Sequence, residues 1–162
     1  MCGFVGIFGF KEPLESARTR ALEMAKTVRH RGPDWSGIYA NERAVLAHDS
    51  RVAVAAVGTC ENLEGVGIDV EPAELLPADL LHLVTTPRER AVIESDPYRG
   101  RLFFVAKEAA YKAVYPLDHA LLGHHDVEVD LANQQATVRN GRVVKLRFCI
   151  STHLVALAFL PS

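Results

Sequence analysis

The apolar and polar positions of the first fifty residues predict a strand, a helix and a hairpin. Cys2–Phe10 alternates apolar residues with glycine, which is typical of a buried strand whose glycine face allows close backbone approach. Apolar residues recur at helical spacing over Leu14–Val28, and a Gly-Pro pair ends this predicted helix. Trp35–Ala40 and Arg43–His48 read as two short strands of a hairpin.

The remainder of the chain combines further helices with a strand-rich C-terminus. A capping box with proline at the first helical position predicts a helix that begins at Thr86–Glu89. Pro72 and Pro77 restrict any helix between them to about one turn. An apolar helix covers Arg101–Ala113. Strands are predicted at His124–Leu131, Gln135–Arg139, Val143–Ile150 and Leu154–Leu160. The pattern indicates an α+β protein with mostly antiparallel strands.

Three carboxylates could meet at one site. Alternation along the strand Gly65–Glu71 places Asp69 and Glu71 on the same face. Glu108 lies four residues before Lys112, so the two share one face of the apolar helix. Mg²⁺ prefers such oxygen ligands, and lysines can hold the phosphates that accompany it. Solubilising charges on an edge strand and a surface ion pair explain the same spacing equally well.

Composition narrows the choice of partner and compartment. The 162 residues are 49% hydrophobic, enough for one domain or two small ones. A formal net charge of −2 gives no general electrostatic basis for binding nucleic acid or an anionic membrane. We see no signal-peptide pattern, and no apolar run approaches the roughly 18 residues of a membrane span. Cys2, Cys60 and Cys149 are too few for a disulfide framework, so a cytoplasmic location is expected.

Two linked motifs resemble a known family. Gly67-Ile-Asp-Val-Glu-Pro72 and Leu102-Phe-Phe-Val-Ala-Lys-Glu-Ala-Ala-Tyr-Lys-Ala113 are similar to the signature pair of 4′-phosphopantetheinyl transferases, most closely the enterobactin-synthetase-activating type. Val45-Leu-Ala-His48 resembles the Ser-x-x-His element of this family, with valine in place of serine. The resemblance covers about residues 47–162 and implies a lobe built from an antiparallel sheet with packed helices.

This resemblance implies a Mg²⁺-dependent reaction. The family transfers 4′-phosphopantetheine from coenzyme A to a serine of an acyl or peptidyl carrier protein, as siderophore, polyketide and nonribosomal peptide biosynthesis require. It implies that Asp69, Glu71 and Glu108 bind the metal. Lys112 and His48 would contact the coenzyme A phosphates, and Lys107 would be a further phosphate or support contact. Glu108, or a water on the metal, would help to deprotonate the serine, so Glu108 and Lys112 are the implied catalytic residues.

The N-terminal segment resembles a different family. Met1-Cys-Gly3, residues 29–40 and Leu46-Ala-His48 are similar to the class II (N-terminal nucleophile) glutaminase domain of bacterial asparagine synthetase, over about residues 1–49. The resemblance implies that Cys2 is a nucleophile with its own α-amine as base. Asp49-Ser50 stand where that family has Glu-Arg-Leu, and the Asn-Gly-Glu oxyanion segment has no counterpart. Loss of an oxyanion hole costs on the order of a hundredfold in rate.

The sequence therefore predicts two parts. A truncated amidotransferase-like strand–helix–hairpin segment (residues 1–49) precedes a phosphopantetheinyl-transferase lobe (residues 50–162), where that family normally has a first lobe of its own. Two alternatives stay open: a glutaminase that acts through Cys2, and a fusion remnant that only binds coenzyme A or a carrier protein. His124-His125-Asp126 is interpreted as a solvated start of a strand, since adjacent strand residues point to opposite faces.

Overall fold

The computed structural model describes residues 3–28, 37–42, 44–49, 54, 56, 63–93, 96 and 98–162. The chain divides into two compact units, Met1–Ala53 and Val54–Ser162. Helices accompany two sheets in which the described strands pair antiparallel, which confirms the α+β prediction. Within the described part of the chain, the helices are too short or too polar to cross a membrane.

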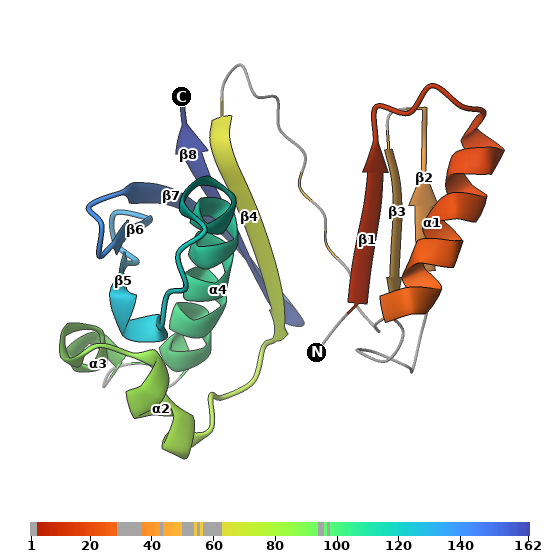
Figure 1. Cartoon of the computed structure of the whole chain (residues 1–162). Coiled ribbons are helices and arrows are strands. Elements are labelled where there is room, and N and C mark those ends of the chain that lie inside the picture. Colours follow the sequence, from red (N-terminus) through yellow and green to blue (C-terminus); the bar gives the residue numbers. More distant parts are fainter. Residues whose placement is uncertain are drawn as a thin grey trace. The chain divides into compact units, whose positions relative to one another are not determined.

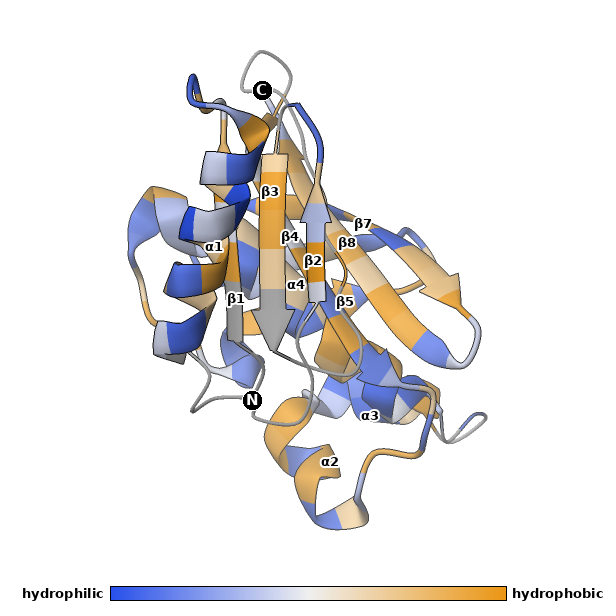
Figure 2. Ribbon diagram, turned by 90° about the vertical axis from the view of Figure 1, so that its right-hand side faces the viewer, coloured by the Kyte–Doolittle hydropathy of each residue, from blue (hydrophilic) through white to orange (hydrophobic). Residues whose placement is uncertain are grey.

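The N-terminal unit is a three-stranded sheet with one helix. Its strands lie in the order β1-β3-β2, and α1 packs on them through small residues (Figure 1). The elements are β1 (Gly3–Phe8), α1 (Leu14–Val28), β2 (Gly37–Ala40) and β3 (Ala44–Asp49). Ala17, Ala21 and Ala25 are buried against this sheet, while the side of α1 visible in Figure 2 is largely hydrophilic. The predicted strand, helix and hairpin are confirmed.

The C-terminal unit is a five-stranded antiparallel sheet packed against a long helix. Its strands are β4 (Leu63–Pro72), β5 (Val127–Asp130), β6 (Gln135–Val138), β7 (Val143–Ile150) and β8 (His153–Pro161), in the order β4-β8-β7-β6-β5. Helix α4 (Arg99–Asp118) covers the sheet (Figure 1), and its apolar side forms the main core with β5–β8. The helix is longer than predicted and ends at His119, which has a left-handed φ of 51°.

Glycines bring β4 unusually close to α4. A Cβ atom on Gly67 would lie 2.1 Å from the carbonyl oxygen of Ala109, and one on Gly65 would lie 2.3 Å from that of Ala113. Both distances are far below van der Waals contact, so only glycine permits this approach. The strand and the helix run antiparallel, because later residues of β4 lie beside earlier residues of α4. Asp69 and Glu71, on the same face as these glycines, therefore point toward the middle and the start of α4.

Two short helices and a helical turn complete the C-terminal unit. Helix α2 (Ala78–Val84) was not predicted; it begins directly after Pro77. Helix α3 (Pro87–Ile93) has the predicted capping box, in which Thr86 N donates to Glu89 Oε2 at 2.8 Å and Glu89 N donates to Thr86 Oγ1 at 3.3 Å. His124–Asp126 forms the 3₁₀ turn η2 rather than the start of a strand, so that prediction was wrong.

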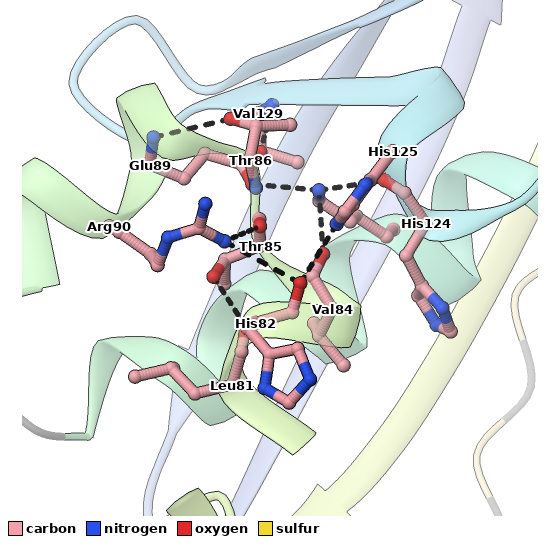
Figure 3. Close-up of polar contacts among 11 residues, drawn as sticks. Leu81, His82, Val84, Thr85, Thr86, Glu89, Arg90, His124, His125 and Val129 are labelled. Atoms are coloured by element: carbon pink, nitrogen blue, oxygen red, sulfur yellow. Dashed lines mark hydrogen bonds and ion pairs between the residues drawn. The ribbon is translucent and has the colours of Figure 1, made fainter. Parts of the chain in front are cut away.

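A buried ion pair connects these elements. Lys107 Nζ lies 2.7 Å from Glu89 Oε2 and donates to the carbonyl oxygens of Val84 (2.9 Å) and His124 (2.8 Å). Both charged side chains are 1% exposed. Glu89 Oε1 accepts from Val129 N at 2.7 Å, and Figure 3 shows this carboxylate between α3 and β5. The pair thereby satisfies main-chain groups of α2, η2 and β5 in the interior.

We expect the Gly67→Ala variant to lose about 1–3 kcal/mol of stability or more, because its methyl group must displace the α4 backbone. Thermal unfolding of the full chain, followed by calorimetry, measures the loss. Gly123→Ala is the matched control, since a Cβ there meets its nearest atom, Asp126 Oδ2, at 3.7 Å. Equal melting temperatures for Gly67→Ala and the parent chain would contradict the close approach.

We expect Lys107→Met to destabilise the protein by about 3–5 kcal/mol, because it leaves the Glu89 carboxylate buried without its cation. Adding Glu89→Gln removes that unpaired charge, so the double variant should be more stable than Lys107→Met alone. A double-mutant cycle from the same calorimetry gives the coupling between the two residues. Strictly additive losses would show that the two side chains do not interact.

Candidate functional site

The antiparallel course of β4 and α4 brings the predicted carboxylates to one face of the C-terminal unit. Asp69 is the most enclosed of them, with a side chain 12% exposed. Lys112 Nζ donates to Asp69 Oδ1 at 2.5 Å and to the carbonyl oxygen of Ile68 at 3.3 Å. Asp69 Oδ2 is buried and has no hydrogen-bond partner in the part of the chain that the structure describes. This oxygen is therefore available to a further cation.

Charges around Asp69 act in opposite directions on its pKa. Burial raises the pKa of the Asp69 carboxyl, and the hydrogen bond and charge of Lys112 lower it. The neighbouring carboxylates of Glu108 and Glu71 raise the pKa further, and burial prevails overall. The negative charges of Glu71 and Glu108 thus act on Asp69, and a bound cation would reduce this repulsion.

Glu71 is paired with the first turn of α4. Arg101 Nη1 lies 3.0 Å from Glu71 Oε2, and Arg101 Nη2 donates to the carbonyl oxygen of Leu75 at 3.0 Å. Both charged side chains are largely buried, which strengthens the pair relative to an exposed one. The charge of Glu71 is therefore neutralised by a residue of α4, as the charge of Asp69 is.

Glu108 is paired with η2. His124 Nε2 lies 3.1 Å from Glu108 Oε1, and each side chain is 33% exposed. The hydrogen bond from His124 lowers the pKa of Glu108; burial opposes it, while the charges of His124 and Lys112 add to the lowering. Glu108 is therefore ionised at neutral pH, and the imidazole must donate from Nε2 because a carboxylate only accepts. Glu108, Tyr111, Gly123 and His124 line a cavity of about 170 Å³.

The donor set fits a hard divalent cation, although it is not assembled around one. Among the described residues, no three His, Cys, Asp or Glu side chains are grouped closely enough to hold a metal. Asp69, Glu71 and Glu108 are each paired with a cationic or hydrogen-bonding partner instead. Three carboxylates with one unpartnered buried oxygen match the chemistry that Mg²⁺ prefers. Glu71 would exchange Arg101 for the ion, and Glu108 has a second oxygen, Oε2, that its contact with His124 does not use.

Lys107 and Lys112, five residues apart on α4, have different surroundings. The side chain of Lys112 is 47% exposed beside Asp69, whereas that of Lys107 is in the interior. Burial lowers the pKa of Lys107, and its hydrogen bond to Glu89 and the charge of Glu89 oppose that shift. The contacts of Lys107 with Glu89, Val84 and His124 use all three ammonium protons. The predicted contact of Lys107 with a phosphate stays a prediction, as does its alternative role as a support for the site.

Two predicted residues belong to the other unit. The backbone of His48 lies in β3, opposite Phe4 of β1 and Gly37 of β2. The His48 side chain and the whole of Cys2 lie outside the described residues. Their predicted roles, as a phosphate contact and as a nucleophile, stay predictions.

The structure adds residues that sequence reasoning missed. Arg101 and His124 contact the carboxylates, and Gly67 permits the approach of β4 to α4. Gly67 could have been found from the sequence, because residues 67, 69 and 71 alternate along the strand and so lie on the same face. Arg101 and His124 gave none, because each meets its carboxylate through a tertiary contact.

Comparison with known proteins separates the two parts of the chain. Residues 1–61 match the glutamine amidotransferase domain. Over 49 residues the chain is 51% identical to asparagine synthetase B (glutamine-hydrolyzing) of Escherichia coli, a match that covers 30% of this chain but 9% of that enzyme. A match of this extent shows similarity to a fragment of the domain.

The second part matches transferases. Over 88 residues the chain is 36% identical to the 4′-phosphopantetheinyl transferase PptT of Mycobacterium tuberculosis, which covers 52% of this chain and 39% of PptT. The Thermotoga maritima holo-[acyl-carrier-protein] synthase structure aligns with a TM-score of 0.46 and 24% identity, over 60% of this chain and 63% of that one. Residues 65–158, which include all three carboxylates and both lysines, match the family model. The chain belongs to the 4′-phosphopantetheinyl transferase superfamily.

Proposed function

We propose that this chain transfers 4′-phosphopantetheine from coenzyme A to a serine of an acyl or peptidyl carrier protein, with Mg²⁺ as cofactor and adenosine 3′,5′-bisphosphate as the leaving group. The observation that carries the proposal is the position of Asp69. Its side chain is 12% exposed, its buried Oδ2 has no hydrogen-bond partner among the described residues, and it lies among Lys112, Glu71 and Glu108. An edge-strand charge that serves only solubility would be exposed, and Asp69 is not.

Asp69, Glu71 and Glu108 would hold the ion. When bound, Mg²⁺ neutralises the charge on the pyrophosphate of coenzyme A. Lys112 would add a positive charge beside the pyrophosphate, since it is the more exposed lysine of the motif and its ammonium group carries three N–H donors on a flexible side chain. Lys112 binds a phosphate as a point charge, and the predicted contact of His48 would add a second donor.

Glu108 accepts the proton of the carrier serine. Its pKa is lowered by the hydrogen bond from His124, so the carboxylate is in the basic form at neutral pH. Lys107 supports the site from the interior through η2 and does not touch the cofactor. The enterobactin-activating subtype, the carrier and its pathway, and a cytoplasmic location stay predictions.

We expect the parent chain to add the phosphopantetheine mass to an apo carrier protein in the presence of coenzyme A and Mg²⁺. Glu108→Gln and Asp69→Asn should slow this transfer by a hundredfold or more, on the order of the loss seen when one charge-stabilising group is removed. Intact-protein mass spectrometry of the carrier measures the rates. Glu64→Gln is the matched control, because Glu64 is an exposed carboxylate of the same strand, 3.7 Å from Arg142.

Two outcomes would contradict this proposal. Equal rates for the parent chain and Glu108→Gln would show that the carboxylates do not act in the reaction. Thermal stabilisation by coenzyme A without any mass shift would identify a binding remnant in place of an enzyme. Chelation of Mg²⁺ should stop the transfer, and addition of Mg²⁺ should restore it.

We expect Cys2 to show no glutaminase chemistry, because the chain lacks a counterpart of the oxyanion segment. Incubation of the full chain with a glutamine-analogue electrophile, followed by peptide mass spectrometry, tests this expectation. Cys149, which is exposed, serves as the internal control for nonspecific thiol labelling. Selective labelling of Cys2, blocked by glutamine, would show that the amidotransferase-like unit is active.

A further inference from the structure

His124 is held in place by neighbouring residues of α4. Its ring packs on Phe104, with the ring centroids 5.4 Å apart. Its Nε2 donates to Glu108 Oε1 at 3.1 Å, and its main-chain carbonyl accepts from Lys107 Nζ at 2.8 Å. Lys107 and Glu108, adjacent along the chain, thus fix the backbone and the ring of one histidine.

The buried lysine explains why η2 is ordered at this point. A buried ion pair is often no more stabilising than apolar residues of similar volume, but it can fix one conformation. Lys107 joins His124 of η2 to Val84 at the end of α2, while Glu89 anchors the ammonium. Figure 3 shows His124 and Val84 beside one another, with His125 directed toward the carbonyl of His82. The turn η2, which contains His124, is therefore linked to α2 and α4 by the hydrogen bonds of Lys107.

The imidazole of His124 contacts the carboxylate of Glu108 at the wall of a cavity. Glu108 and His124 both line the 170 Å³ cavity and are partly exposed, so their contact is not needed to satisfy a buried core group. The hydrogen bond occupies Oε1 of Glu108 and leaves Oε2 as the oxygen that can turn to another ligand. Hydrogen bonds of this kind orient metal-binding carboxylates in proteins.

We propose that His124 is a positioning residue of the site: it holds Oε1 of Glu108 so that Oε2 is presented to the divalent cation. This inference rests on the proposed function, because it assumes that Glu108 binds the ion. It adds a residue outside both signature motifs, on a turn that the sequence pattern assigned to a solvated strand. Its chemistry requires an N–H donor at the Nε2 position, which glutamine can supply and phenylalanine cannot.

Binding of Mn²⁺ to the full chain, titrated by electron paramagnetic resonance, tests the inference without using turnover. We expect His124→Phe to weaken Mn²⁺ binding by about ten- to a hundredfold, as removal of such a supporting hydrogen bond does elsewhere. The variant keeps an aromatic ring against Phe104, so packing is preserved. His124→Gln should recover most of the affinity. In the transfer assay, kcat should be lowest for His124→Phe and closer to that of the parent chain for His124→Gln, while KM for the carrier stays near its original value.

His82→Phe is the control, since only the main-chain carbonyl of His82 takes part in these contacts, and it should bind Mn²⁺ like the parent chain. Undiminished Mn²⁺ affinity in His124→Phe would overturn the inference and leave the proposed function standing. Equal losses in His124→Phe and His124→Gln would also overturn it, because the hydrogen bond would then not be the cause. If the parent chain neither binds Mn²⁺ nor transfers phosphopantetheine, the proposed function itself fails and this inference with it.

Discussion

The contact between Gly67 and the α4 backbone is the constraint on which the candidate site depends. A strand and a helix normally stand apart by the length of their side chains, but here a strand residue meets the carbonyl oxygen of Ala109 directly. Only this approach lets a short aspartate side chain on the next inward position meet a lysine of the helix. The glycines of the motif therefore set the geometry, and its acidic residues supply the chemistry.

Each of the three carboxylates has a partner within the C-terminal unit. Lys112, Arg101 and His124 each neutralise or hydrogen-bond one carboxylate, which avoids the cost of gathering unpaired negative charge in a partly buried site. A divalent cation that replaces Arg101 and Lys112 would gain the carboxylates of Glu71 and Asp69, and the released lysine would become available to phosphate. Binding of metal and binding of phosphate are thus coupled through the same ion pairs, since neither Asp69 nor Lys112 can serve both partners fully.

Sequence reasoning found the elements whose pattern is local and missed the contacts that are not. Helix α3 followed from its capping box, and β4 with Asp69 and Glu71 followed from alternation and family resemblance. Helix α2 was missed because it spans only seven residues after a proline, and a short amphipathic segment gives little periodicity. His124 was assigned to a strand because the alternation of β5 extends into it, whereas its actual conformation is set by Lys107 and Glu108, far away in sequence.

The two lysines of the helix motif show why burial must be known before a role is assigned. In sequence both are cations beside Glu108, yet Lys107 is enclosed with Glu89 and Lys112 is open to solvent. All three carboxylates and their partners lie within the unit Val54–Ser162, so the proposed metal site is complete without the amidotransferase-like unit. Metal binding at the proposed site therefore depends on residues of this one unit, whereas the predicted contact of His48 with coenzyme A concerns a residue of the other.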